Sequence, residues 1–274
     1  MLCQFTWTLI LLLIVIGFLI GILNTVAGAG GGVFFVSFLV LFLQVPFNVA
    51  RDTSIFTTVI ASSLAFILYL KQKRINLKFT LVISLFSILG SFLCWVFLFF
   101  FPLSNEVLKV IFGVILTITA INMLVKVFID WKIHGESNKN YEDSEIEINK
   151  QNFTSHLKKG IPFFIISGFT AHLLGIGGGV INTPACHLIL GFPIHISTAT
   201  STGIIFFTAI FNVIMKIFFG EINYFIGFLL ASGSVFGAII GAKVSYKMPK
   251  VHLQAFVGVF LIILGIYMLF SLTS

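Results

Sequence analysis

The sequence contains very little charge: Asp, Glu, Lys and Arg make up 9% of its 274 residues, whereas hydrophobic residues make up 58%. A soluble domain is usually about a quarter charged, so the composition excludes an ordinary soluble protein. Several apolar runs reach the roughly 20 residues that a helix needs to span a bilayer. One of them, FTWTLILLLIVIGFLIGIL at residues 5–23, is apolar on every face, whereas barrel strands would alternate. We therefore predict an all-α polytopic membrane protein.

Cysteine is rare, and the common catalytic motifs are missing from the sequence. Cys3, Cys94 and Cys186 are far apart and form no CxxC pair, so we interpret them as buried thiols. The chain has no H-E-x-x-H, no G-x-S-x-G and no paired carboxylates within an apolar run. The sequence thus predicts no catalytic residues, no metal and no cofactor, which argues against an enzyme.

The formal net charge of +7 does not indicate a nucleic-acid partner, because the basic residues gather between apolar runs. Such clusters are typical of cytoplasmic loops under the positive-inside rule. The expected partners are a lipid bilayer and a small ligand, and a homo-oligomer is compatible with the sequence. The two clusters are Lys71, Lys73, Arg74 and Lys78, and Lys243, Lys247 and Lys250.

The chain contains an internal duplication. A shift of 147 positions, from Gly30 to Gly177, aligns glycines, prolines and a Thr-Ser pair without a gap. We therefore predict two repeats, residues 1–129 and 161–274, joined by a polar linker at 130–160. The linker holds six of the nine acidic residues, so we expect it to be solvated and partly disordered. The matches include Gly21 with Gly168, Pro46 with Pro193, Thr53-Ser54 with Thr200-Ser201, and Gly90 with Gly237.

Each repeat is expected to form five apolar segments, and an odd number inverts the second repeat relative to the first. The loop charges agree: loop 71–78 is basic and loop 102–105 is not, whereas in the second half KIFFGEIN is balanced and KVSYKMPKVH is basic. This predicts a cell-membrane protein with its linker and basic loops cytoplasmic and both termini outside. The segments are expected at about 5–27, 30–43, 53–70, 79–101, 106–128, 161–175, 178–191, 199–219, 225–242 and 253–272.

A glycine triplet separates the first two segments of each repeat, within GAGGG at 28–32 and GIGGG at 175–179. Segments 161–175 and 178–191 have about 14 residues each, or roughly 21 Å of helix, which is less than the roughly 30 Å hydrocarbon core. We therefore predict a glycine-broken hairpin that either re-enters the membrane or tilts. Broken helices near the midplane hold the substrate in many secondary transporters.

The glycines admit two interpretations. A Gly-rich turn before a helix N-terminus can bind an anion through free backbone amides, and small residues can also serve close helix packing. Two repeat-equivalent triplets favour the anion site. The predicted substrate-binding residues are Asn24, Thr25, Gly30, Gly31, Gly32, Thr53, Ser54, His172, Gly177, Gly178, Gly179, Asn182, Thr183, Thr200 and Ser201.

Three sets of polar residues near these turns have alternative roles. The Thr-Ser pairs 53–54 and 200–201 either donate to a ligand or cap the helices that follow. Arg51 and Asp52 are expected in water at the outer end of a segment, with recruitment of an anion as the alternative. His172 is expected to make a neutral polar contact, with a proton relay as the alternative.

The motifs NTVAGAGGGVFF…VPFNVARDTS and GIGGGVINTPACHLILGFPIHISTATS resemble the paired motifs of the TauE/SafE family of sulfite and organosulfonate exporters. The resemblance covers essentially the full chain. It implies transport of small sulfur-containing anions or other organic anions. The first motif departs from the family pattern at Ser37, where proline is usual, and at Arg51-Asp52, where small or apolar residues are usual.

The function expected from the sequence is secondary transport of a small anion, such as sulfite or a sulfonate, by alternating access around the two glycine turns. No ATP-binding motif is present, so a gradient or a partner would supply the energy. An anion channel is the first alternative, and a membrane-embedded enzyme is the less favoured one.

Overall fold

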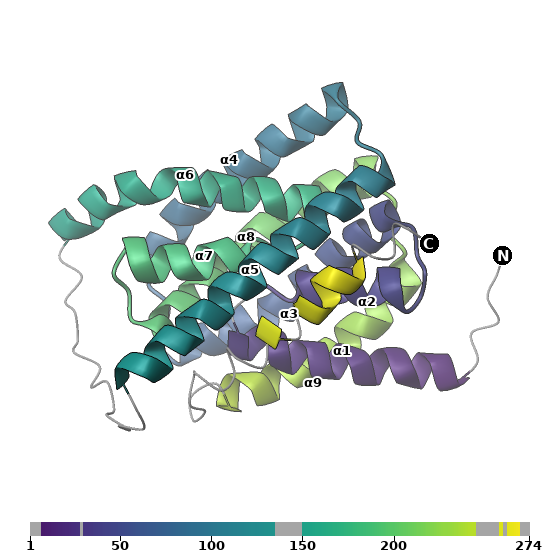
Figure 1. Cartoon of the computed structure of the whole chain (residues 1–274), viewed down its shortest axis with the longest axis horizontal. Coiled ribbons are helices and arrows are strands. Elements are labelled where there is room, and N and C mark those ends of the chain that lie inside the picture. The colour runs from purple at the N-terminus through teal and green to yellow at the C-terminus, as the bar shows by residue number, and fades with distance from the viewer. Residues whose placement is uncertain (1–6, 28–29, 135–149, 245–257, 260–261, 269–274) are drawn as a thin grey trace.

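The computed structural model describes residues 7–27, 30–134, 150–244, 258–259 and 262–268. These residues form helices and no strands, which confirms the all-α prediction. Figure 1 shows the long helices lying alongside and across one another. The helices are α1 (Trp7–Ala27), α2 (Gly32–Leu41), α3 (Phe47–Lys71), α4 (Leu77–Phe100), α5 (Asn105–His134), α6 (Lys150–Leu174), α7 (Gly179–Pro184) with the π-helical turn η1 (Ala185–Ile189), α8 (Ile194–Phe219) and α9 (Tyr224–Val244).

Five of the described helices, α1, α3, α4, α8 and α9, are long and apolar enough to cross a membrane. Their outer faces carry large exposed hydrophobic side chains, such as Leu85, Phe99, Phe228 and Phe236. Extensive apolar surface of this kind suits contact with lipid rather than water. The protein is therefore a polytopic helical membrane protein, as predicted.

Two repeat-equivalent prolines set the starts of the central helices. α3 begins directly after Pro46 and α8 directly after Pro193. Proline fits a helix start because its φ is fixed and its missing N–H needs no intrahelical partner there. Both helices consequently begin before the predicted segments 53–70 and 199–219, and Arg51 lies inside α3 rather than at its edge.

The first arm of each glycine hairpin is long and the second is short. α6 has 25 residues and begins at Lys150, inside the predicted linker, and α5 reaches into the same stretch. The prediction of a short segment at 161–175 is wrong, because the helix continues beyond its apolar run into the polar residues 150–160. α2 has 10 residues and α7 has 6, so neither crosses a bilayer alone.

The two repeats pack against each other through two equivalent helix pairs. α1 packs along α9, and α6 packs along α4, which is the same pairing with the repeats exchanged. A Cβ on Gly21 would overlap the backbone carbonyl of Ser234. In the other pair, Gly168 corresponds to Gly21 and Ser87 to Ser234, and a Cβ on Gly168 would overlap the backbone carbonyl of Ser87. Reciprocal contacts are typical of two copies related by a twofold axis. The inversion of the repeats relative to the bilayer stays a prediction.

Three connections meet at one end of the molecule. The backbone N–H of Asn48, at the start of α3, donates to Oδ1 of Asn105 at 3.1 Å. The side chain of Asn48 donates to Oε2 of Glu221, in the α8–α9 connection, at 2.7 Å. The inverted arrangement predicted from the loop charges groups these same connections on one side of the membrane.

Alanine at Gly168 is expected to lower the unfolding temperature of the detergent-solubilised protein. The new Cβ would meet the backbone of Ser87 on α4, and overpacking of this kind typically costs about 1–3 kcal/mol. Gly160→Ala on the same helix is the control, because its Cβ would meet only the end of the Phe164 side chain. Equal unfolding temperatures for the two variants would contradict this close approach of α4 and α6.

Candidate functional site

The two glycine turns lie against each other inside the protein. We call residues 30–32 the first tip and residues 175–179 the second tip. A Cβ on Gly32 would overlap the carbonyl oxygen of Gly175, and a Cβ on Gly177 would lie 2.9 Å from that of Gly30. The tips therefore meet backbone to backbone, and the glycines serve close packing as well as turn formation.

The backbone of both tips requires glycine. The φ angles of Gly30 and Gly31 are +89° and +53°, and those of Gly177 and Gly178 are +79° and +74°. Side chains disfavour this left-handed region, whereas glycine adopts it readily. The N-caps of the two short helices, Gly31 and Gly178, both have positive φ, so α2 and α7 each begin directly after a glycine that a residue with a side chain would replace at a cost.

Ser54 on α3 joins the two tips. Its Oγ donates to the carbonyl oxygen of Gly32 at 3.1 Å and to that of Gly175 at 3.2 Å. The Oγ1 of Thr53 accepts from the backbone N–H of Asn223 at 3.0 Å. Neither residue caps α3, because that helix begins at Phe47. The N-cap interpretation of the Thr-Ser pair is therefore wrong.

The equivalent pair in the second repeat is also buried within a helix. Thr200 is 2% exposed and Ser201 is fully buried. Both lie beyond the first turn of α8, which follows the N-cap Pro193. They do not cap α8, and both side chains lie in the interior of the protein.

Asn24 and Thr25 end α1 beside the first tip. A Cβ on Gly31 would lie 2.8 Å from Cγ of Asn24, so the amide of Asn24 packs directly on the tip. The hydroxyl of Thr25 donates to the carbonyl of Gly21 at 2.9 Å, and the Thr25 carbonyl accepts from the hydroxyl of Tyr69 at 2.7 Å. Of these two predicted residues, Asn24 therefore has its side chain at the tip.

Two buried polar side chains near the second tip lack partners within the described part of the chain. Asn182 on α7 is fully buried, and neither its Oδ1 nor its Nδ2 makes a hydrogen bond. Thr58 on α3, whose methyl group faces Gly177, has an unpartnered Oγ1. Buried polar atoms are normally hydrogen-bonded, so these atoms are candidates for contact with a polar ligand. Thr183, next to Asn182, is half-buried.

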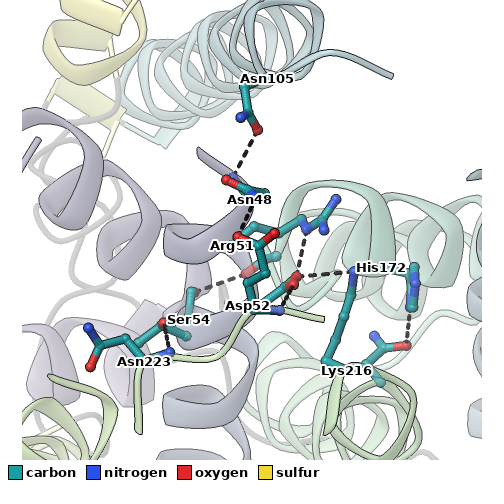
Figure 2. Close-up of polar contacts among 12 residues, drawn as sticks. Asn48, Arg51, Asp52, Ser54, Asn105, His172, Lys216 and Asn223 are labelled. Carbon is teal, nitrogen blue, oxygen red and sulfur yellow. Dashed lines mark hydrogen bonds and ion pairs between the residues drawn. The ribbon is translucent and has the colours of Figure 1, made fainter. Parts of the chain in front are cut away.

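Arg51, Asp52 and Lys216 form a buried cluster, which we call the charged cluster (Figure 2). Oδ1 of Asp52 lies 2.7 Å from Nε of Arg51 and 3.1 Å from Nζ of Lys216. Oδ2 of Asp52 accepts from the backbone N–H of Glu221 at 3.0 Å. Arg51 and Asp52 are 8% and 1% exposed, so the expectation that they lie in water is wrong.

The charged cluster borders the second tip. A Cβ on Gly175 would lie 2.8 Å from the carbonyl oxygen of Arg51 and 3.0 Å from its Cγ. Ser54, which joins the tips, lies less than one helical turn beyond Arg51 on α3. The cluster and the tips therefore form one continuous site.

His172 lies at the end of α6, next to the second tip. Its Nδ1 contacts Oδ1 of Asn212 at 3.0 Å (Figure 2), and the ring is 1% exposed. An amide oxygen only accepts, so Nδ1 donates in this contact. The polar contact expected for His172 is confirmed.

Lys216 and Asn212 are absent from the residues predicted for the site. The predicted segment 199–219 contained Lys216, although its charge was counted with the loop KIFFGEIN; it is 6% exposed in the last turn of α8, with Asn212 one turn earlier. A signal was present in the sequence, because Lys216 lies inside the predicted membrane segment 199–219, and an ionisable residue within such a segment is by default a functional candidate.

The charged cluster occurs in one repeat only. Under the shift of 147 positions, Arg51, Asp52 and Lys216 correspond to Thr198, Ala199 and Tyr69. Ala199 and Tyr69 belong to an apolar group with Ile75 at the opposite end of the site. Because uncharged residues occupy the equivalent positions of the other repeat, the fold of the repeat does not require charged side chains there.

Comparison with known proteins gives consistent results. The profile of the family described as sulfite exporter TauE/SafE matches residues 13–268. The probable membrane transporter protein YunE of Bacillus subtilis is 26% identical, and the match covers 95% of this chain and 97% of the relative. The probable membrane transporter protein MJ0441 of Methanocaldococcus jannaschii is 28% identical over 97% and 98% of the two chains. No solved structure matches this chain.

Proposed function

The chain belongs to the TauE/SafE family of membrane transporters, and on this premise we propose that it is a secondary transporter of a small anion. The proposed substrate is a sulfur oxyanion, such as sulfite or a sulfonate. The main support is the charged cluster, in which two cationic side chains and one carboxylate are buried beside the glycine tips. Buried charge is costly in a membrane protein and generally marks a functional site.

The substrate is proposed to bind where the two tips meet. The N-terminus of α2 lies at this junction, and a helix N-terminus carries partial positive charge. The unpartnered side chain of Asn182 and the hydroxyl of Thr58 offer further donors. The positive charge of the cluster and these neutral donors together favour an anion over a cation or a neutral solute.

Alternating access is proposed to occur by movement of one repeat against the other around this junction. At one end, polar contacts between the repeats join α3 to the α8–α9 connection, through Asn48, Asp52 and Thr53. At the other end, the equivalent region is apolar and includes Ile75 and Ala199. Different kinds of contact therefore hold the repeats together at the two ends of the site, so the contacts at one end can break while those at the other end remain.

The proposed orientation places the basic α3–α4 connection in the cytoplasm and the α8–α9 connection outside. Single cysteines at the exposed residues Lys73 and Glu221, introduced separately into a chain without its native cysteines, provide the test. In intact cells, a membrane-impermeant maleimide should label the cysteine at position 221 and spare the one at 73. The reverse pattern would invert the orientation.

Sulfur oxyanions are expected to raise the unfolding temperature of the purified protein selectively. A ligand at a hundred times its dissociation constant stabilises the folded state by about 2.7 kcal/mol. The panel contains sulfite, sulfonates, thiosulfate, sulfate, carboxylates and cations. Stabilisation by carboxylates or cations alone would contradict a sulfur anion as the substrate.

Flux into proteoliposomes then distinguishes a carrier from a channel. A carrier should show uptake that saturates with substrate concentration and is accelerated by unlabelled substrate on the opposite side. Uptake that rises linearly, with no acceleration from the opposite side, would contradict alternating access and favour an anion channel.

A further inference from the structure

The charged cluster leaves one positive charge uncompensated by any neighbouring acidic side chain in the described part of the chain. Asp52 is the carboxylate of the cluster, and it pairs with both Arg51 and Lys216. Glu221 lies at the same end, but it is exposed, it bonds to Asn48, and it forms no ion pair with either cation. Because all three residues of the cluster are more than nine-tenths buried, water screens the excess charge poorly.

Arg51 also retains unused hydrogen-bond donors. Among the described residues its side chain makes one hydrogen bond, from Nε to Asp52. In Figure 2 a dashed line joins the guanidinium group of Arg51 to Asp52. Terminal guanidinium nitrogens are suited to two-point binding of an oxyanion, and the stem of Arg51 lies directly on Gly175 of the second tip.

We propose that Arg51 and Lys216 bind the acidic group of the substrate, and that the single excess positive charge of the cluster selects anions with one negative charge over anions with two. This inference rests on the proposed function and narrows its substrate class to monoanions such as sulfonates. A monoanion makes the buried site neutral. A dianion leaves one negative charge in excess, which is costly in a poorly solvated site.

Methanesulfonate and sulfate are matched probes for this selection. Both are tetrahedral sulfur oxyanions, and the methyl group of one takes the place of the fourth oxygen of the other, so they differ mainly in charge. Isothermal titration calorimetry of the purified full-length protein gives both dissociation constants. The wild-type protein is expected to bind methanesulfonate at least about tenfold more tightly, because removing a dianion from water and leaving one negative charge in excess in a buried site costs more free energy than a tenfold change in affinity.

Three variants change the charge of the cluster in steps. Lys216→Gln makes it neutral and should weaken binding of both anions by about tenfold or more. Asp52→Asn adds one positive charge and should move the preference toward sulfate by a similar factor. The double variant Asp52→Asn/Lys216→Gln restores the original excess charge and should restore the preference for methanesulfonate, which a purely structural role would not predict.

Lys243→Gln is the control, because it removes a positive charge from an exposed position at the end of α9. It should leave both dissociation constants unchanged. Dissociation constants that differ by less than twofold in the wild-type protein, or a ratio that does not move toward sulfate in Asp52→Asn, would overturn the charge selection while leaving anion binding intact. If the wild-type protein binds neither anion nor any other sulfur oxyanion, the proposed function fails together with this inference. Should Asp52→Asn fail to fold, the wild-type ratio still decides the outcome.

Discussion

Replacement of Gly177 by alanine is expected to abolish substrate transport by a protein that still folds and reaches the membrane. Two effects act at this position. A φ of +79° costs a residue with a side chain about 1–2 kcal/mol. In addition, the new Cβ would lie 2.9 Å from the carbonyl oxygen of Gly30, so it would push the two tips apart at the proposed binding site.

Gly191→Ala separates these two effects. Gly191 has nearly the same backbone conformation, with φ +73°, but a Cβ there would meet nothing within 4 Å. Both variants therefore carry similar backbone strain, and only Gly177→Ala disturbs the junction of the tips. Uptake into proteoliposomes at equal amounts of folded protein is the measurement. Equal losses in the two variants would attribute the effect to strain alone and would contradict a functional junction.

The helical membrane fold could be predicted from the sequence because the bilayer requires long apolar helices. The runs that became α1 and α4 are apolar over nearly their whole length, and backbone groups in lipid must be satisfied within the helix. The contact between the tips could be anticipated from the duplication, because matched glycines in two repeats are expected to lie near a common axis. The hydropathy pattern and the internal repeat are therefore sufficient to predict the overall arrangement of the helices.

The details of the site could not be predicted, because they depend on which face of each helix is buried. Hydropathy placed the start of α3 too late, so Arg51 and Asp52 were assigned to water although both lie inside the helix. Lys216 lay within the predicted segment 199–219, but its charge was counted with the loop that follows. The ion pair between Asp52 and Lys216 joins residues that lie far apart in the sequence, and a local sequence pattern cannot predict such a contact. The earlier start of α3 after Pro46 was the available signal.

Replacement of Asp52 by alanine is expected to destabilise the protein strongly. Asp52 neutralises two buried cations and accepts the backbone N–H of Glu221. Removing one member of a buried ion pair typically costs about 3–5 kcal/mol, because the remaining charge is left buried without a partner. Unfolding of the purified protein in mixed detergent micelles, followed by circular dichroism against the fraction of denaturing detergent, measures the loss.

The double variant Asp52→Ala/Lys216→Met decides whether that loss comes from the unpaired charge. It removes one cation together with the carboxylate, so it should lose less stability than Asp52→Ala alone, although each substitution deletes native contacts. Glu221→Gln is the control and should change stability by less than about 1 kcal/mol, because its carboxylate is exposed. A double variant as unstable as the sum of the two single variants would mean that Asp52 and Lys216 are not coupled. A favourable coupling energy between Asp52 and Lys216 would instead show that the pair stabilises the protein. Because the equivalent positions of the other repeat hold neutral residues, the protein would then maintain a buried charge pair that its fold does not require.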